Sequence, residues 1–552
     1  MRKLIKAAFD NNIPLIPLAF VGIVSAYREM FPDKAMTAET WLALAVCALI
    51  PWFLLWTGKT SSPKYQNEHY DGRSAAMRPN PPPDMLYKQP VGFCFGTFKG
   101  QYVCKRVDEP GSILVCGGSG TGKSASIIQS FLLNPENKKN CNTLTLDLKH
   151  ELADFCVAQD EVYSTKNQAG TTILLDPLDR QNGYGYDPFF QLSEKSTDTE
   201  VHEVMEVVAS SLIPVPKGDN AIWGQQAQQF LRGAMTFFYQ QGHKTLPDII
   251  RAIKAAPIQD ITEQILSSAV PGSTAYIDII GFSGMPEETI MSVSMNLTNA
   301  VTRFITSPDL EWCLGTNPRK CNPADMLERS IYLCLPEHML TEWSPLVFLV
   351  FNQFLSWMMG LPEHASDPER KRFALILDET VALLKGVGAP MPLLSQCLRI
   401  GARGKGCTML ICAQSLAGLD DIMGHDEVKD MVSNMSYKYI LDSSDTGTSD
   451  EIIKWGGKFL RRKVSTSGAG MEQKSTVSYE QEDIITHSDL MTLPKSGDII
   501  LITNRAGYLR LKKCFVFKDP YFKRLLEQVK QSKQKKEDDK CLEQTENKKS
   551  QN

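Results

Sequence analysis

The stretch SILVCGGSGTGKS, residues 112–124, decides the fold. Its first five residues have the composition of a buried strand, and the rest fits the pattern G-x-x-x-x-G-K-S. A helical pattern, SASIIQSFLL, follows at residues 124–133. In this strand–loop–helix order, backbone N–H groups surround phosphates at a helix N-terminus. We therefore expect a phosphate-binding loop made of Gly117, Gly118, Ser119, Gly120, Thr121, Gly122, Lys123 and Ser124.

The residue types of this loop predict how it binds a nucleotide. Its glycines let the backbone approach the phosphates, Lys123 reaches the β- and γ-phosphates, and the Ser124 hydroxyl is a ligand for Mg²⁺. The loop thus predicts ATP and Mg²⁺ as cofactors. The alternative is a glycine-rich turn that binds no phosphate, and the flanking strand and helix argue against it.

A second signal lies far downstream, where the apolar run FALIL (residues 373–377) ends at Asp378 and Glu379. We expect Asp378 to hold Mg²⁺ through water, and Glu379 to orient and deprotonate the attacking water. An apolar strand that ends at acidic residues is common in itself, but the phosphate loop upstream favours this interpretation. We also expect this strand to lie beside the strand that precedes the loop.

A third apolar run, TMLIC (residues 408–412), is followed by Gln414. At the carboxyl end of a strand, this side chain is placed to sense the γ-phosphate; a glutamine that caps the loop is the alternative. Arg403 lies in the basic loop before the run. We expect it to act as an arginine finger across a subunit boundary, and a solvated basic loop is the alternative. The predicted catalytic residues are Lys123, Asp378, Glu379, Gln414 and Arg403.

Further apolar runs at residues 143–146, 171–175 and 330–335 end in polar turns, with helical stretches between them. This alternation predicts an α/β fold, a RecA-like P-loop NTPase with a mostly parallel sheet. Residues 191–317 show helical spacing without strand-like alternation, which predicts an inserted all-α subdomain.

The first sixty residues contain two apolar runs, residues 13–27 and 41–56, each near the length that spans a bilayer. Basic residues flank both outer ends, which predicts an N-terminal two-helix transmembrane hairpin with both chain termini in the cytoplasm. A cleaved signal peptide is the alternative, but no small-x-small cleavage site follows Tyr27. We therefore expect a multi-pass protein of the cell's inner membrane.

These patterns divide the chain into six predicted parts. They are a transmembrane hairpin (1–60), a linker and entry segment that is Pro-rich over 61–83 (61–100), the nucleotide-binding domain in two pieces (101–190 and 318–520), the all-α subdomain (191–317) and a polar tail (521–552). We expect that tail to be helical over 521–529 and disordered after it.

Composition excludes two classes of function. The formal net charge of −4 argues against a protein that coats nucleic acid over its whole surface. The 14 cysteines contain no C-x-x-C pair, so zinc-finger and thioredoxin-like sites fail on spacing. A local basic channel remains compatible with this composition.

The order of the motifs resembles the type IV secretion coupling proteins, the conjugative-transfer ATPases of the TraG/TraD type. The segments that carry the resemblance span residues 112–504 and read GGSGTGKS, TLDLKHEL, LLDPLD with YDPF, WGQQAQQFLRGA, IYLCLP, LILDET, ARGKG, ICAQS and HSDLMTLPKSGDIILITN. One segment departs from the family pattern Asp-Pro-Lys-Gly-Glu, because Leu148 and His150 replace the Pro and the Gly. The departure puts the backbone shape of that loop in doubt and spares its charged positions.

The resemblance implies a homo-oligomeric ring, a hexamer, docked beneath the membrane. Such a motor recruits a relaxase bound to single-stranded DNA and passes it to a type IV secretion channel, with the helical insert as the substrate-receiving end. Two alternatives stay open: a coupling ATPase for protein effectors only, and a non-hydrolysing membrane receptor or scaffold. A chromosome pump of the FtsK type would carry a C-terminal winged-helix module, and the polar stretch after Val529 leaves no room for one.

Overall fold

The computed structural model describes residues 24–32, 37, 38, 40, 41, 80–153, 172–215, 221–443, 445–467 and 474–531. The chain divides into two compact units, Arg73–Phe459 with Glu482–Asn552, and Met1–Gly72 with Leu460–Gln481. In the second unit the described residues include a helix over 24–30, and β13 (Lys458–Ser467) pairs with β14 (Lys474–Asp483).

The predicted transmembrane hairpin falls largely outside the described residues. Among the helices that are described, none has the length and apolar character needed to cross a bilayer. The hairpin therefore stays a prediction.

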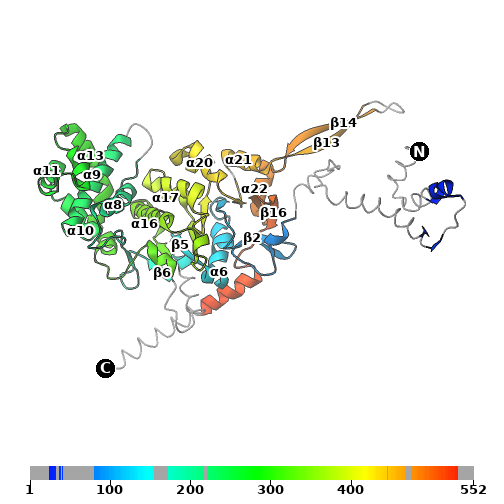
Figure 1. Ribbon diagram of the computed structural model, residues 1–552, viewed down its shortest axis with the longest axis horizontal. Helices are drawn as coiled ribbons and strands as arrows, with labels where there is room; N and C mark the ends of the chain where they lie inside the picture. The colour runs from blue at the N-terminus through cyan, green and yellow to red at the C-terminus, as the bar shows by residue number, and fades with distance from the viewer. Residues whose placement is uncertain are drawn as a thin grey trace, which may run out of the picture. The chain divides into compact units, whose positions relative to one another are not determined.

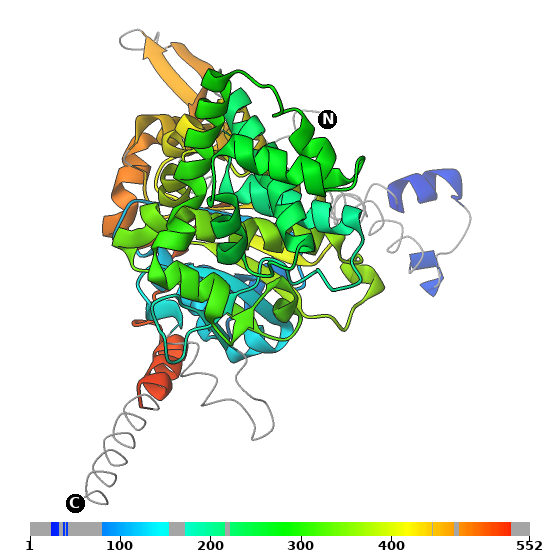
Figure 2. The same ribbon diagram turned by 90° about the vertical axis from the view of Figure 1, so that its left-hand side faces the viewer.

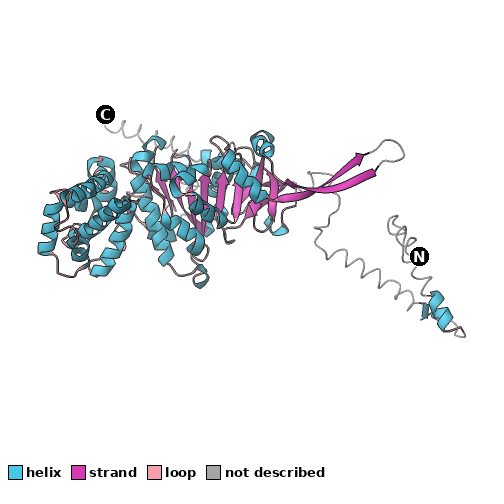
Figure 3. Cartoon of the chain, turned by 90° about the horizontal axis from the view of Figure 1, so that it is seen from above, coloured by secondary structure: helices cyan, strands magenta, loops and turns pink. Residues whose placement is uncertain are grey.

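Within the described residues, the larger unit is built on a twelve-stranded sheet of order β1-β3-β2-β16-β15-β12-β4-β11-β10-β5-β9-β6 (Figures 1 and 3). The seven strands from β12 to β6 are parallel, and helices cover them on both sides, which explains their apolar sequences. The prediction of a mostly parallel sheet is confirmed for this part. These strands are β12 (Tyr437–Ile440), β4 (Ile113–Cys116), β11 (Cys407–Ala413), β10 (Arg372–Leu377), β5 (Cys141–Asp147), β9 (Ser330–Cys334) and β6 (Thr172–Leu175).

The other five described strands of this sheet form an antiparallel edge that the sequence analysis did not predict. They are β1 (Leu86–Tyr87), β2 (Phe93–Phe98), β3 (Gln101–Lys105), β15 (Asp498–Thr503) and β16 (Gly507–Lys512). Strands β1 and β2 lie in the later part of the segment predicted as a linker and entry segment, residues 61–100. Phe93 and Phe95 are buried in the core, because alternate residues of β2 face the helices next to the phosphate loop.

Strand β4 shows how the two faces of the sheet are used. Ile113 and Val115 pack with Ile127 and Phe131 of the helical segment that follows the phosphate loop, η2 (Ser124–Ile128) and α5 (Gln129–Leu133). Leu114 and Cys116 face the other side of the sheet, where they belong to the hydrophobic cluster that includes α16 (Leu340–Gly360). Alternation along a strand places successive side chains on opposite faces, so burial on both sides fixes the height of the loop that follows β4.

The described part of residues 191–317 is helical, as predicted, and forms the bundle at one end of the unit (Figures 1 and 2). Its hydrophobic residues belong to the same cluster as those of the sheet, and both lie in one compact unit. Its boundary as a separate subdomain therefore stays a prediction. The helices are α8 (Asp198–Leu212), α9 (Ala221–Gln240), α10 (Leu246–Ile253), α11 (Ile258–Ser268), α12 (Thr274–Ile280), α13 (Glu287–Val301), α14 (Arg303–Thr306) and α15 (Pro308–Glu311).

A helix spans residues 520–531, where the helical part of the predicted tail begins. Phe522 and Val529 on this helix are fully buried, and they pack with Cys94, Cys104 and Leu133. The helix is amphipathic, and the antiparallel edge of the sheet supplies the surface that its apolar face covers. The helix is therefore part of the core, and the remaining predicted tail, residues 532–552, lies outside the described residues.

Candidate active site

The phosphate loop lies at the carboxyl end of β4, as predicted. Its backbone turns through Gly120 (φ +75°) and Gly122 (φ +91°), conformations that L side chains rarely adopt. The Thr121 hydroxyl donates to the Gly118 carbonyl at 2.8 Å and closes the turn. The two glycines with positive φ explain why this spacing of glycines is needed for the loop to curl.

Lys123 is folded into the loop. Its ammonium group donates to the carbonyl oxygens of Gly117 at 3.0 Å and Gly118 at 3.3 Å, and the residue is only 6% exposed. The partners that the structure gives this buried cation are neutral carbonyls. A phosphate entering the loop would therefore meet a positive charge that has no ion pair with any described residue, beside backbone N–H groups.

Ser124 and Asp378 meet directly. The Ser124 hydroxyl donates to Asp378 Oδ2 at 2.6 Å, while Asp378 Oδ1 is buried and makes no hydrogen bond to any described atom. A hydroxyl next to a carboxylate with a free oxygen is the donor set that Mg²⁺ takes in P-loop sites. These two residues therefore fit Mg²⁺, as the sequence predicts.

The order of the strands that bring Ser124 and Asp378 together differs from the prediction. Strand β10, which ends just before Asp378, was expected to lie beside β4, but β11 runs between them. The sequence gives no local signal for this order, because all three strands are short, apolar and buried. The pair meets across β11 because Asp378 and the loop both lie just beyond the carboxyl ends of their strands.

Glu379 and Gln414 also lie together at this edge of the sheet. The Gln414 amide donates to Glu379 Oε2 at 3.3 Å. Burial raises the pKa of the Glu379 carboxyl, Lys123 opposes the rise, and the Asp378 carboxylate adds to it. A carboxylate with a raised pKa is a stronger base than an ordinary one, which suits proton abstraction from water.

Arg403 is not brought to this site. It precedes β11, whereas Gln414 follows it, and a seven-residue strand spans roughly 20 Å. Arg403 is exposed and lines a cavity with Glu109, Tyr437 and Arg505, and it has no ion pair with any described residue. Within one chain it therefore cannot contact a nucleotide bound at Lys123.

Two residues missed by the sequence analysis contact the phosphate loop. Lys513 donates through its ammonium group to the Thr121 carbonyl at 3.0 Å, and burial lowers its pKa. The Phe515 ring lies against Gly122, where a Cβ atom would stand 2.5 Å from its Cε1. No sequence pattern links them to the loop, because they follow β16 almost 400 residues later.

The segment that departs from the family pattern keeps the shape that a glycine would give it. His150 has φ +57°, in the left-handed region that glycine favours. The Asp147 carboxylate accepts N–H groups from Lys149 at 3.3 Å and Ala153 at 2.7 Å, which closes the turn. The replacement of Gly by His therefore leaves the loop shape intact, and it places the imidazole 3.6 Å from Asp176.

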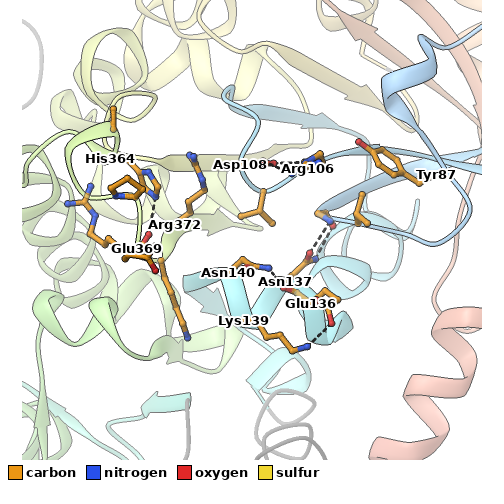
Figure 4. Close-up of a pocket in the computed structure, with 17 residues that line it drawn as sticks. Tyr87, Arg106, Asp108, Glu136, Asn137, Lys139, Asn140, His364, Glu369 and Arg372 are labelled. Carbon is orange, nitrogen blue, oxygen red and sulfur yellow. Dashed lines mark hydrogen bonds and ion pairs between the residues drawn. The ribbon is translucent and has the colours of Figure 1, made fainter.

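A cavity of about 890 Å³ opens near the amino ends of the strands (Figure 4). It is lined by Tyr87, Arg106, Glu136, His364 and Arg372, among others, and the last of these begins β10. The phosphate loop and Glu379 lie at the carboxyl ends of the strands, whereas this cavity lies at their amino ends. It is therefore separate from the nucleotide site despite its size.

Comparison with known proteins identifies relatives of the chain. A model of the family described as type IV secretory system conjugative DNA transfer matches residues 76–540. No curated protein sequence matches.

Solved structures of the bacterial conjugative coupling protein TrwB share the fold. TrwB with the non-hydrolysable ATP analogue ADPNP has a TM-score of 0.59 at 18% identity, over 79% of this chain and 93% of that one. The unbound form TrwBdeltaN70 gives 0.57 at 20% identity, over 77% and 90%. TrwB with ADP and Mg²⁺ gives 0.55 at 18% identity, over 77% and 91%.

The close approach of Phe515 to Gly122 generates a prediction. Gly122→Ala should weaken the binding of inorganic pyrophosphate about tenfold or more, because overpacking of this kind costs about 1–3 kcal/mol and displaces the loop. Isothermal titration calorimetry measures the affinity. Gly100→Ala is the matched control, because Gly100 also has a positive φ (+81°) but open space around its Cβ position. Equal affinity of Gly122→Ala and the wild-type protein would contradict this account of the loop.

Proposed function

Because the chain belongs to the type IV secretory system conjugative DNA transfer family, we propose that it is a membrane-anchored coupling protein driven by ATP hydrolysis. In this proposal it recruits a relaxase with its single-stranded DNA and passes both to a type IV secretion channel. The family match supports DNA as the cargo, and the geometry of the site supports a step driven by a nucleotide.

The observation that carries the proposal is the hydrogen bond between Ser124 and Asp378. It brings the end of the phosphate loop next to the acidic pair, which is the requirement for phosphoryl transfer from a bound nucleotide. The proposal assigns ATP and Mg²⁺ as cofactors. TrwB solved with ADPNP, and with ADP and Mg²⁺, supports this assignment.

Each residue of the site has a role in the proposed hydrolysis. Lys123 and the loop N–H groups hold the β- and γ-phosphates and offset the charge that develops in the transition state. Glu379 orients the attacking water and accepts its proton, and Gln414 holds the Glu379 carboxylate in place and faces the γ-phosphate. Ser124 and Asp378 would hold Mg²⁺, which would supply further charge neutralisation at the phosphate oxygens.

The proposed assembly is a hexameric ring beneath the inner membrane. The apolar runs at residues 13–27 and 41–56 support an anchor with both chain termini in the cytoplasm. The helical bundle over 198–316 would face the cytoplasm and receive the substrate. A ring places a second subunit against each nucleotide site, so that binding and hydrolysis change the contacts between neighbours.

We place Arg403 at this boundary between subunits. It is exposed and without an ion pair to any described residue, whereas Arg399 and Lys405 of the same loop pair with Asp430 and Glu363. A free guanidinium that cannot reach the nucleotide of its own chain is suited to reach that of a neighbour. There it would stabilise the charge of the transition state, as arginine fingers do.

The function is tested by measuring ATP hydrolysis and DNA transfer together. Glu379→Gln should lower the turnover of the full-length protein about 100-fold or more while ATP still binds, because the general base is lost. Lys123→Ala should remove both turnover and conjugative transfer, and single-stranded DNA should stimulate the wild-type enzyme. Lys195→Ala, an exposed lysine of the same chain, is the control.

The outcomes separate the alternatives. A wild-type protein without turnover that still supports transfer would indicate a receptor or scaffold. Turnover that single-stranded DNA leaves unchanged, with a protein effector still secreted, would indicate protein cargo alone. Wild-type transfer frequency in the Lys123→Ala variant would refute an ATP-driven role.

The Arg403 assignment is tested by mixing inactive variants. Arg403→Ala alone should lower hydrolysis about 10³-fold or more, the range of an arginine finger. Mixed with Lys123→Ala subunits, it should recover hydrolysis, because some boundaries then combine an intact Lys123 with an intact Arg403 from the neighbour. Arg399→Ala is the control within the same loop. A mixture no more active than its components would argue against action across subunits.

A further inference from the structure

The segment after β16, residues 513–518, forms one wall beside the phosphate loop. Besides the contact of Lys513 with Thr121, the Val516 backbone N–H donates to the Ala125 carbonyl at 3.1 Å. Ala125 lies in the first turn of the helix that follows the loop. The segment is therefore fixed to the loop at Thr121 and to the helix after the loop at Ala125.

Two aromatic rings of this segment form a platform, defined here as Phe515 and Phe517. Their centroids are 5.1 Å apart and their planes are tilted by 27°, so they stack. Phe515 lies against Gly122, whereas Phe517 is 49% exposed. The ammonium groups of Lys513 and Lys518 lie 5.3 Å and 5.2 Å from the centroid of the Phe515 ring.

The direction of a bound nucleotide follows from the loop. Lys123 reaches the β- and γ-phosphates, and the N–H groups at the start of the helix hold the phosphates nearer the sugar. The α-phosphate thus lies toward Ser124 and Ala125. The segment that carries the platform is bound to Ala125 through Val516, at the end of the loop from which the sugar and the base would leave.

We propose that the exposed face of Phe517, backed by Phe515, stacks against the nucleobase of the bound nucleotide. This inference rests on the proposed nucleotide site and adds a base subsite to it. Stacking of a base on an aromatic ring is favourable and tolerant of base identity, because every base has a π-face. Lys513 and Lys518 add positive charge where the α-phosphate and sugar pass.

The subsite makes a prediction that separates the base from the phosphates. In the full-length protein, Phe517→Ala should weaken ADP binding about 5- to 150-fold, the range that removal of a stacking ring gives for one base. It should leave the affinity for inorganic pyrophosphate unchanged, since pyrophosphate has no base. Phe517→Trp should retain ADP affinity, and GDP should behave like ADP. Isothermal titration calorimetry measures all of these affinities.

Met291→Ala removes a side chain of comparable exposure (59%) from α13 and is the matched control. The inference is overturned if Phe517→Ala binds ADP as the wild-type protein does, or loses ADP and pyrophosphate equally. The first result would mean that Phe517 does not contact the base. The second would mean that Phe517 only supports the phosphate loop. If the wild-type protein binds ADP no more tightly than pyrophosphate, the base subsite is refuted and the nucleotide site is not. If the wild-type protein binds neither ligand, both the base subsite and the nucleotide site are refuted.

Discussion

The hydrogen bond from the Ser124 hydroxyl to Asp378 joins two parts of the chain that are 254 residues apart, and the rest of the site depends on it. It forms because β4, β11 and β10 are neighbouring parallel strands whose carboxyl ends lie within two residues of one another in register. Long apolar helices such as α16 cover one face of these strands, and the helix after the loop covers the other. Burial on both faces fixes the positions of the strand ends, and these in turn position Ser124 and Asp378.

The local signals of the site could be predicted from the sequence. The loop, the strand ending at Asp378 and Glu379, and the strand before Gln414 are each continuous stretches, so residue type and spacing reveal them. The family resemblance drawn from the order of the motifs is confirmed by the family match. Local patterns could not predict the strand order, in particular the position of β11 between β4 and β10. Short apolar strands resemble one another, so their sequences do not indicate which strands pair.

The antiparallel edge and its consequences were missed for a related reason. Strands β2 and β16 pair although more than 400 residues separate them, and Pro-rich sequence before β1 favoured a linker. Phe515 reaches Gly122, and the helix over 520–531 covers the antiparallel edge, through contacts between segments far apart in the sequence. The wall behind the phosphate loop is thus a product of tertiary structure. The six-part division of the chain and the membrane hairpin remain predictions.

The central claim is that Ser124 and Asp378 share one Mg²⁺ with a bound nucleotide, and electron paramagnetic resonance with Mn²⁺ in place of Mg²⁺ tests it most directly. The account predicts that Mn²⁺ binds the full-length protein tightly only when ADP is present. It also predicts that Asp378→Asn weakens Mn²⁺ binding at least about tenfold, as loss of a residue that holds a metal through water does. Mn²⁺ binding that needs no nucleotide, or that Asp378→Asn leaves unchanged, would contradict it.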